Sequence, residues 1–186
     1  YDINPEACEP KDLKLDDMNQ CELIFISVPT PMSKDGSCHL NIIESVLSDL
    51  KSINYQGFII LRSTVPAGTC DKLNVYFMPE FLTEKNFVED FKNCQDWIFG
   101  IKGTSQDEPF QKNIQKLFNT SFNAGCIKYN TIHFIQTKEA ETIKLFRNNY
   151  LSVKVAFCNE MAEFCDKQCI DYETVRKLSV IDPRIG

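Results

Sequence analysis

The segment ELIFISVPTP (22–31) decides the fold class. Its apolar run, 22–28, predicts a buried strand, and the prolines that follow end that strand because proline has no N–H for a hydrogen-bonded ladder. A second apolar strand is expected at 58–61. Between the two, residues 40–53 repeat apolar side chains every three or four positions, the period of an amphipathic helix. Continuous apolar strands joined by a helix predict parallel pairing beneath covering helices.

The same alternation of strands and helices continues toward the carboxyl end. Further strands are expected at 74–78, 97–101 and 125–129, with a helix at about 106–118. We therefore expect an α/β fold with an incomplete parallel sheet. The opening YDINP (1–5) is typical of the end of a buried strand that brings an acidic residue into a loop, so we expect the fold to begin before it.

The last third of the sequence has a different pattern. Residues 137–167 keep helical periodicity without a proline, which predicts one long helix. Such a helix is about 45 Å long at 1.5 Å per residue, so we expect it to span domains or subunits. A shorter helix is expected at 172–178, and the two together indicate the start of a helical domain in 136–186.

Composition narrows the classes of protein and partner. The 186 residues, 43% of them hydrophobic, allow one domain, or a domain with part of a second. A net charge of −6 argues against nucleic-acid or anionic-membrane partners. The nine cysteines form no C-x-x-C pair and only two histidines accompany them, which argues against a zinc site. Because no signal peptide or long apolar run is present, we expect reduced thiols in a cytoplasmic protein, with a secreted disulfide protein as the alternative.

Three consecutive loops are expected at the carboxyl edge of the sheet, where open α/β proteins hold ligands. The first, PTP (29–31), is also consistent with a simple strand-ending turn. The second, RSTVPAGT (62–69), carries hydroxyls that suit a phosphate, a sugar or a water. The third holds Glu80 and Glu84, which would raise each other's pKa if close, as suits a general base. Their alternative is a pair of exposed loop carboxylates.

The long helix carries a second group of candidates. Lys144 and Asn148 lie four residues apart and project from one face. The lysine can donate to a developing oxyanion and the asparagine can fix a hydroxyl, whereas the alternative is a solvated face. Glu139 and Glu141, near the helix start, are expected to stabilise its positive end.

Five motifs in order resemble the UDP-glucose and GDP-mannose dehydrogenase family: FISVPTP, RSTVPAGT, MPEFLTEKNF, EAETIKLFRNNYLSVKVAFCNE and IDPRIG. The resemblance covers nearly the whole chain. It implies a Rossmann-like fold and oxidation of the C6 alcohol of a nucleotide sugar to a carboxylate, with two NAD molecules and a cysteine-bound thioester. UDP-glucose, giving UDP-glucuronate, is the expected substrate. UDP-N-acetylmannosamine, UDP-N-acetylglucosamine and GDP-mannose stay open.

The resemblance also implies catalytic roles. Glu80 corresponds to the glutamate linked to thioester hydrolysis, and Thr64 corresponds to the threonine that helps place the water. Lys144 corresponds to the lysine that supports the oxyanion, and Asn148 to an asparagine in the sugar site.

Substrate contacts are implied for Phe81, Leu82 and Glu84. Arg184 corresponds to an arginine that reaches the substrate, in some members from a neighbouring subunit. No residue is expected to bind a metal.

Cofactor contacts are implied for four residues of the expected NAD-binding domain, 1–135. Asp2 resembles the acid that holds the adenosine ribose, Thr30 and Thr64 lie along the dinucleotide, and Glu84 lies near the nicotinamide.

The family's glycine-rich turn is expected before YDIN, and its nucleophilic cysteine is expected beyond IDPRIG, so we expect this segment alone to be inactive. Arg147 stands where the family has a small residue, which leaves the substrate open. A homodimer through the long helix is expected. One alternative is a truncated, non-catalytic nucleotide-sugar-binding or assembly module. Another is a 3-hydroxyacid dehydrogenase relative, against which the PEFLTE loop argues.

Overall fold

The computed structural model describes residues 1–185 and divides the chain into two compact units, Tyr1–Leu145 and Phe146–Gly186. Gly186, the last residue of the IDPRIG motif, lies outside the described residues. The boundary between the units falls after Leu145, within the long helix. The domain boundary predicted just before that helix, at 135/136, stays a prediction.

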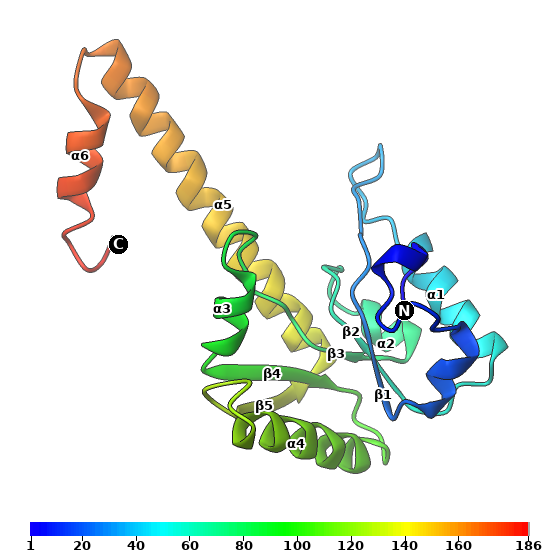
Figure 1. The fold of residues 1–186 in the computed structure, drawn as a ribbon. Helices are drawn as coiled ribbons and strands as arrows, with labels where there is room; N and C mark the ends of the chain where they lie inside the picture. Colours follow the sequence, from blue (N-terminus) through cyan, green and yellow to red (C-terminus); the bar gives the residue numbers. More distant parts are fainter. Residues whose placement is uncertain (186) are drawn as a thin grey trace. The chain divides into compact units, whose positions relative to one another are not determined.

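The first unit contains a five-stranded sheet in which the strands pair in sequence order (Figure 1). The strands are β1 (Leu23–Ile26), β2 (Phe58–Leu61), β3 (Tyr76–Phe77), β4 (Asp96–Ile101) and β5 (Thr131–Gln136). Neighbours pair in parallel except β3 and β4, which are antiparallel. The predicted parallel sheet is therefore confirmed except at this junction, where β3 and β4 are antiparallel. The reason is that the connection after β3 does not cross back to the edge where β3 begins.

Helices surround the sheet and continue into the second unit. They are α1 (Asn41–Ser52), α2 (Thr69–Leu73), α3 (Phe87–Lys92), α4 (Asp107–Asn123), α5 (Thr137–Lys167) and α6 (Tyr172–Ser179), with short 3-10 helices at Pro5–Ala7 and Leu15–Gln20. The four predicted helices are confirmed. Helices α2 and α3 escaped prediction because five or six residues hold too little periodicity.

The core lies on both faces of the sheet because successive side chains of a strand point to opposite sides. Leu61 and Phe77 pack in one apolar cluster, which includes residues of α1. Their neighbours Ile60 and Tyr76 pack in the other, which includes α4. In that second cluster Phe110 is fully buried and stacks on Tyr76 with ring centroids 3.7 Å apart.

Two expected strands do not form. Residues 125–129 are an irregular segment that begins in the turn after α4, where Gly125 has a φ of +72°, a left-handed conformation suited to glycine. The strand follows at β5 instead. The opening YDIN segment is also irregular, with Tyr1 57% and Ile3 94% exposed. A strand needs a neighbour for its backbone hydrogen bonds, and β1 pairs only with β2 in residues 1–185.

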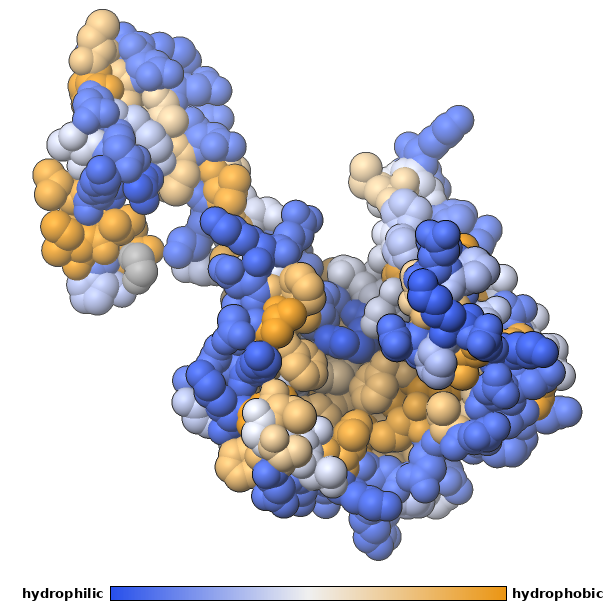
Figure 2. All heavy atoms as spheres, in the orientation of Figure 1, coloured by the Kyte–Doolittle hydropathy of each residue, from blue (hydrophilic) through white to orange (hydrophobic). Residues whose placement is uncertain are grey.

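The second unit exposes many large apolar side chains, which appear in orange in Figure 2. Those on the helices include Phe146, Tyr150, Val153, Phe157, Phe164 and Leu178. None of the helices in residues 1–185 is both long and apolar enough to cross a lipid bilayer.

Candidate active site

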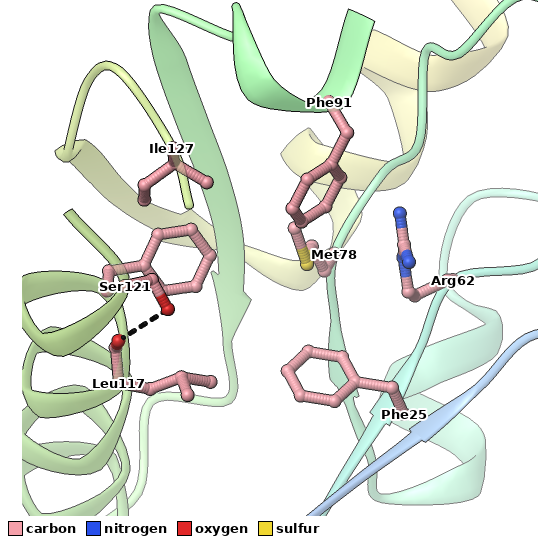
Figure 3. A pocket seen from close by; sticks show the side chains of 8 residues that line it. Phe25, Arg62, Met78, Phe91, Leu117, Ser121 and Ile127 are labelled. Carbon is pink, nitrogen blue, oxygen red and sulfur yellow. Dashed lines mark hydrogen bonds between the residues drawn. The ribbon is translucent and has the colours of Figure 1, made fainter. Parts of the chain in front are cut away.

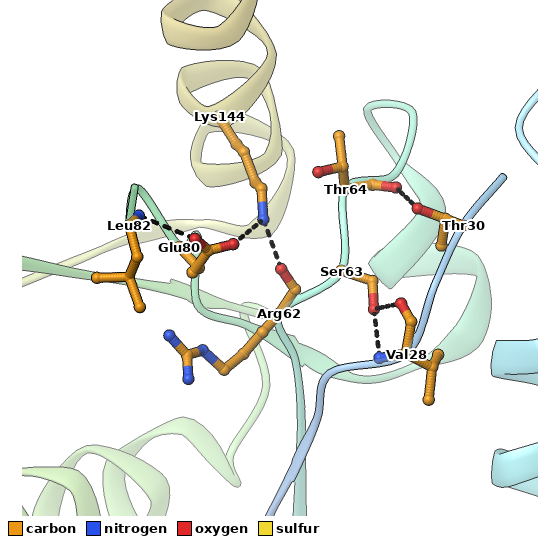
Figure 4. Close-up of polar contacts among 8 residues, drawn as sticks. All are labelled: Val28, Thr30, Arg62, Ser63, Thr64, Glu80, Leu82 and Lys144. Atoms are coloured by element: carbon orange, nitrogen blue, oxygen red, sulfur yellow. Dashed lines mark hydrogen bonds and ion pairs between the residues drawn. The ribbon is translucent and has the colours of Figure 1, made fainter. Parts of the chain in front are cut away.

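The loops that leave β1 and β2 are joined by side-chain hydrogen bonds at the carboxyl edge of the sheet (Figure 4). Ser63 Oγ accepts a hydrogen bond from the Val28 N–H at 3.0 Å and donates one to the Val28 carbonyl at 2.6 Å. Thr30 Oγ1 donates to the carbonyl of Thr64 at 2.8 Å. The prediction that these loops meet at one edge is therefore confirmed.

Lys144 brings helix α5 to the same place. It is 3% exposed, so the alternative of a solvated face is wrong for this residue. Its Nζ donates to the carbonyl of Arg62 at 2.7 Å and lies 3.5 Å from Glu80 Oε2. An ammonium has three donors, so the two contacts leave one N–H for a ligand.

Glu80 is held in a defined position by its own loop. Its Oε1 accepts a hydrogen bond from the Leu82 N–H at 2.8 Å. The Glu80 side chain is 36% exposed, so the carboxylate faces both Lys144 and solvent. That is the setting a residue needs if it is to take a proton from a water.

Burial sets the electrostatics of the cluster. Desolvation lowers the pKa of Lys144 below its ordinary value; the nearby Glu80 opposes the shift and Arg62 adds to it. Desolvation likewise lowers the pKa of Arg62, and the nearby Glu80 again opposes this shift. Within residues 1–185 the buried Arg62 Nε has no hydrogen-bond partner. Two cations beside one carboxylate favour an anionic ligand or a developing negative charge.

Thr64 lies next to this cluster. Its backbone carbonyl accepts from Thr30, whereas its Oγ1 makes no hydrogen bond to the described part of the chain. In Figure 4 this hydroxyl points away from Thr30. It is therefore able both to donate to and to accept from a bound water or ligand.

Two depressions flank the cluster. One, of about 340 Å³, is lined by Thr30, Cys38, Thr64 and Pro66 among others. Its place at the carboxyl ends of parallel strands and its two threonines fit a dinucleotide. The other, of about 310 Å³, is apolar, and Arg62 is its one charged lining residue (Figure 3).

The remaining predicted residues are spread more widely. Phe81 and Leu82 are half-buried in the Glu80 loop, and Glu84 is exposed further along it. No hydrogen bond joins Glu84 to Glu80 within 1–185, and the predicted interaction of the two carboxylates stays a prediction. Asp2 is exposed, and its Oδ1 accepts from the Asn4 N–H at 2.8 Å.

Asn148 and Arg184 belong to the second unit. Asn148 is exposed, one helical turn beyond Lys144 on α5. Arg184 is exposed and pairs with Asp182, with Nη2 2.5 Å from Oδ2. Their predicted roles in the sugar site stay predictions.

Glu141 is the residue whose place the sequence did not reveal. Instead of serving the positive end of α5, it is fully buried and accepts hydrogen bonds from the Gly68 N–H at 2.5 Å and the Cys70 N–H at 2.7 Å. The available signal was its spacing of three from Lys144, which places both on one helix face.

Known proteins of one family match this chain along almost its whole length. Residues 11–121 match the NAD binding domain of the UDP-glucose/GDP-mannose dehydrogenase family, and residues 138–186 match that family's central domain. A UDP-glucose 6-dehydrogenase of Campylobacter jejuni is 32% identical over 175 residues, 87% of this chain and 42% of the relative. The UDP-glucose 6-dehydrogenase of Rickettsia bellii is 30% identical over 198 residues, which are 97% of this chain and 44% of that relative. The chain thus spans about two fifths of the length of these two relatives.

Solved structures show the same fold. A GDP-mannose dehydrogenase from Pseudomonas aeruginosa has a TM-score of 0.72 at 22% identity, covering 90% of this chain and 41% of that one. A UDP-D-ManNAc dehydrogenase from Pyrococcus horikoshii has a TM-score of 0.75 at 19% identity, covering 93% and 43%. The sheet and helices are therefore Rossmann-like, and the cofactor of the matched domain is NAD. The chain belongs to the UDP-glucose/GDP-mannose dehydrogenase family.

Proposed function

We propose that the complete protein oxidises the C6 hydroxyl of a nucleotide sugar to a carboxylate, with UDP-glucose and its product UDP-glucuronate as the first candidates. The observation that carries this proposal is the contact of the buried Lys144 with the Arg62 carbonyl and Glu80, beside the hydroxyl of Thr64. This cluster joins a cation, a carboxylate and a hydroxyl at the ligand-binding edge of the sheet.

Each residue of the cluster has a distinct task in the proposal. The third N–H of Lys144 stabilises the oxyanion, and its burial strengthens that interaction because water does not screen it. The partly exposed Glu80 accepts a proton from the hydrolytic water, which the Thr64 hydroxyl orients. When bound, NAD supplies the acceptor for the hydride. The nucleophilic cysteine that the family resemblance implies is not one of these residues.

Other residues complete the proposed binding sites. Thr30 and Thr64 line the 340 Å³ depression, which supports their place along NAD. Asp2 and Glu84 are proposed as further cofactor contacts, on the adenosine ribose and near the nicotinamide.

Phe81, Leu82 and Glu84 are proposed to contact the substrate because the resemblance assigns them to it and the Glu80 loop carries them. Asn148 and Arg184, in the second unit, are proposed as further sugar-site residues.

The test is NADH formation by the complete gene product with NAD and a panel of UDP-glucose, UDP-N-acetylmannosamine, UDP-N-acetylglucosamine and GDP-mannose. Oxidation of an alcohol to an acid removes two hydrides, so we expect two NADH per sugar. Absence of NADH with every sugar would refute the proposal.

A second candidate function is a non-catalytic assembly module. The exposed apolar side chains of α5 and α6 favour it, because large apolar patches mark interaction surfaces. Nucleotide-sugar binding without NADH formation would support this function over catalysis.

We also propose that the protein forms a homodimer through the long helix. We further propose a cytoplasmic location, because the nine free cysteines suit a compartment that keeps thiols reduced. A monomer by light scattering at micromolar concentration would contradict the dimer.

A further inference from the structure

Three buried polar residues form a stripe along the first turns of α5. Thr137 is 1%, Glu141 is 0% and Lys144 is 3% exposed. Their spacings of four and three place them on one face of the helix. Buried polar groups are costly unless they are hydrogen-bonded, and all three are.

Residues 62–70 are the loop after β2 together with the first two residues of α2. The stripe fastens both ends of this loop to α5. Lys144 Nζ holds the start of the loop through the Arg62 carbonyl at 2.7 Å. Glu141 holds its end through the N–H groups of Gly68 and Cys70, at 2.5 and 2.7 Å. Thr64 lies between the two attachments.

The chemistry of the two attachments is complementary. A cation meets a carbonyl at one end, and a carboxylate meets two amides at the other, so both are charge-assisted hydrogen bonds, which are stronger than neutral ones. Just beyond the loop, the Thr137 hydroxyl donates to the Asp71 carboxylate on α2. The loop therefore has a fixed position relative to the helix that carries Lys144.

We propose that Glu141 is a positioning residue for the reaction: it holds the Thr64 hydroxyl in register with the Lys144 ammonium. This inference rests on the proposed function, because the register matters only if these two groups act on one substrate. No other residue of α5 contacts the far end of the loop by a hydrogen bond in the described chain.

The informative change is Glu141→Gln. A glutamine has one acceptor oxygen for two N–H donors, and its own NH₂ faces one of them. A displacement of about 1 Å at a reacting group costs about 100-fold in rate. In the complete enzyme we therefore expect a loss in kcat of about 10-fold to 100-fold, with KM for NAD and for the nucleotide sugar changed less than about twofold.

The pH profile gives a readout that a merely structural role would not move. Burial lowers the pKa of Lys144. A loosened loop admits water to Lys144 and raises that pKa toward its ordinary value, so the alkaline limb of kcat shifts to higher pH. Glu141→Asp keeps the carboxylate and should restore part of kcat.

Amide hydrogen exchange tests the attachment without any substrate. Glu141→Gln should speed exchange at Gly68 and Cys70. Glu108→Gln is the matched control, because Glu108 is exposed on α4 and, within residues 1–185, pairs only with Lys112.

The outcomes separate the two proposals. If the wild type is active and Glu141→Gln keeps both its kcat and the alkaline limb of its pH profile, the positioning role of Glu141 is overturned. The proposed function is then unaffected. A Glu141→Gln variant with a lower Tm but unchanged kcat per active site shows a structural role only, and also overturns it. A wild type without NADH formation refutes the proposed function. In that case, if Glu141→Gln also leaves amide hydrogen exchange at Gly68 and Cys70 unchanged, the attachment of the loop through Glu141 is overturned as well.

Discussion

Replacement of Lys144 by methionine separates its catalytic role from its structural role. Methionine has nearly the length and volume of the lysine stem but no donor, so the packing of the 3% exposed side chain is retained. If the ammonium supports an oxyanion, its loss should lower kcat by about 10²–10³-fold, as the removal of one oxyanion donor does.

The expected effect on stability is much smaller. The Arg62 carbonyl, which accepts from Lys144 Nζ at 2.7 Å, loses its donor, at a cost of about 1–3 kcal/mol. Glu80 loses a cation at 3.5 Å, but its side chain is 36% exposed and water replaces much of that interaction. Removing the desolvation cost of a buried ammonium offsets part of the loss. The net change in the free energy of unfolding should be within about 2 kcal/mol.

Two assays on one preparation test this reasoning. Urea denaturation gives the free energy of unfolding, and NADH formation by the complete gene product gives kcat. Lys112→Met on α4 is the control, because Lys112 is 70% exposed and pairs with Glu108. The reasoning is refuted if Lys144→Met loses less than about tenfold in kcat, or if it does not fold.

Three further predictions follow from individual contacts. Gly100→Ala should cost about 1–3 kcal/mol of stability, measured by urea denaturation, because the added Cβ would lie 2.8 Å from the Cα of Thr137. Stability unchanged by that substitution would contradict the close packing of β4 on α5. Ser63→Ala should cost about 1–3 kcal/mol, measured the same way, because it leaves the Val28 N–H and carbonyl without their partner; an unchanged urea midpoint would count against it. Burial makes the pKa of Lys144 lower in the folded protein than in the unfolded chain. At pH values between these two pKa values, the unfolded chain therefore binds more protons than the folded protein. The free energy of unfolding should then rise with pH through that window. The rise should be smaller for Lys144→Met than for the wild type in paired denaturation series, because Lys102, whose pKa is also lowered by burial, still contributes.

The sequence predicted those parts of the fold that have a strong local pattern. The strand at 58–61 and the helix at 137–167 occur with the predicted bounds, because a continuous apolar run and a long helical period each leave few alternatives. The reversal of β4 depends on the path of the connection after β3, which no local pattern records. The strand predicted at 125–129 does not form, although Ile127 is apolar and buried, because this residue lies in an irregular segment between α4 and β5.

The sequence predicted some residues of the candidate site and not others, because motifs record some positions and not their burial. Motifs located Thr64, Glu80 and Lys144, and the structure brings these three segments together. Periodicity cannot tell a buried carboxylate from an exposed one, so Glu141 was read as a surface acid at the start of a helix. Only the amides of Gly68 and Cys70, which lie more than 70 residues earlier in the chain, explain its burial.

These long separations connect the folding of the first unit to its chemistry. Lys144 contacts a carbonyl 82 residues away, and Glu141 contacts an amide 73 residues away. Neither charged side chain can be buried at acceptable cost until the loop 62–70 supplies its partners. The start of α5 therefore docks on an ordered loop, and the docked helix in turn holds both ends of that loop. The hydrogen bonds of Ser63 and Thr64 to the segment after β1 hold the loop as well. It follows that the residues proposed to act on the substrate come into position in the same cooperative step that closes the core around α5.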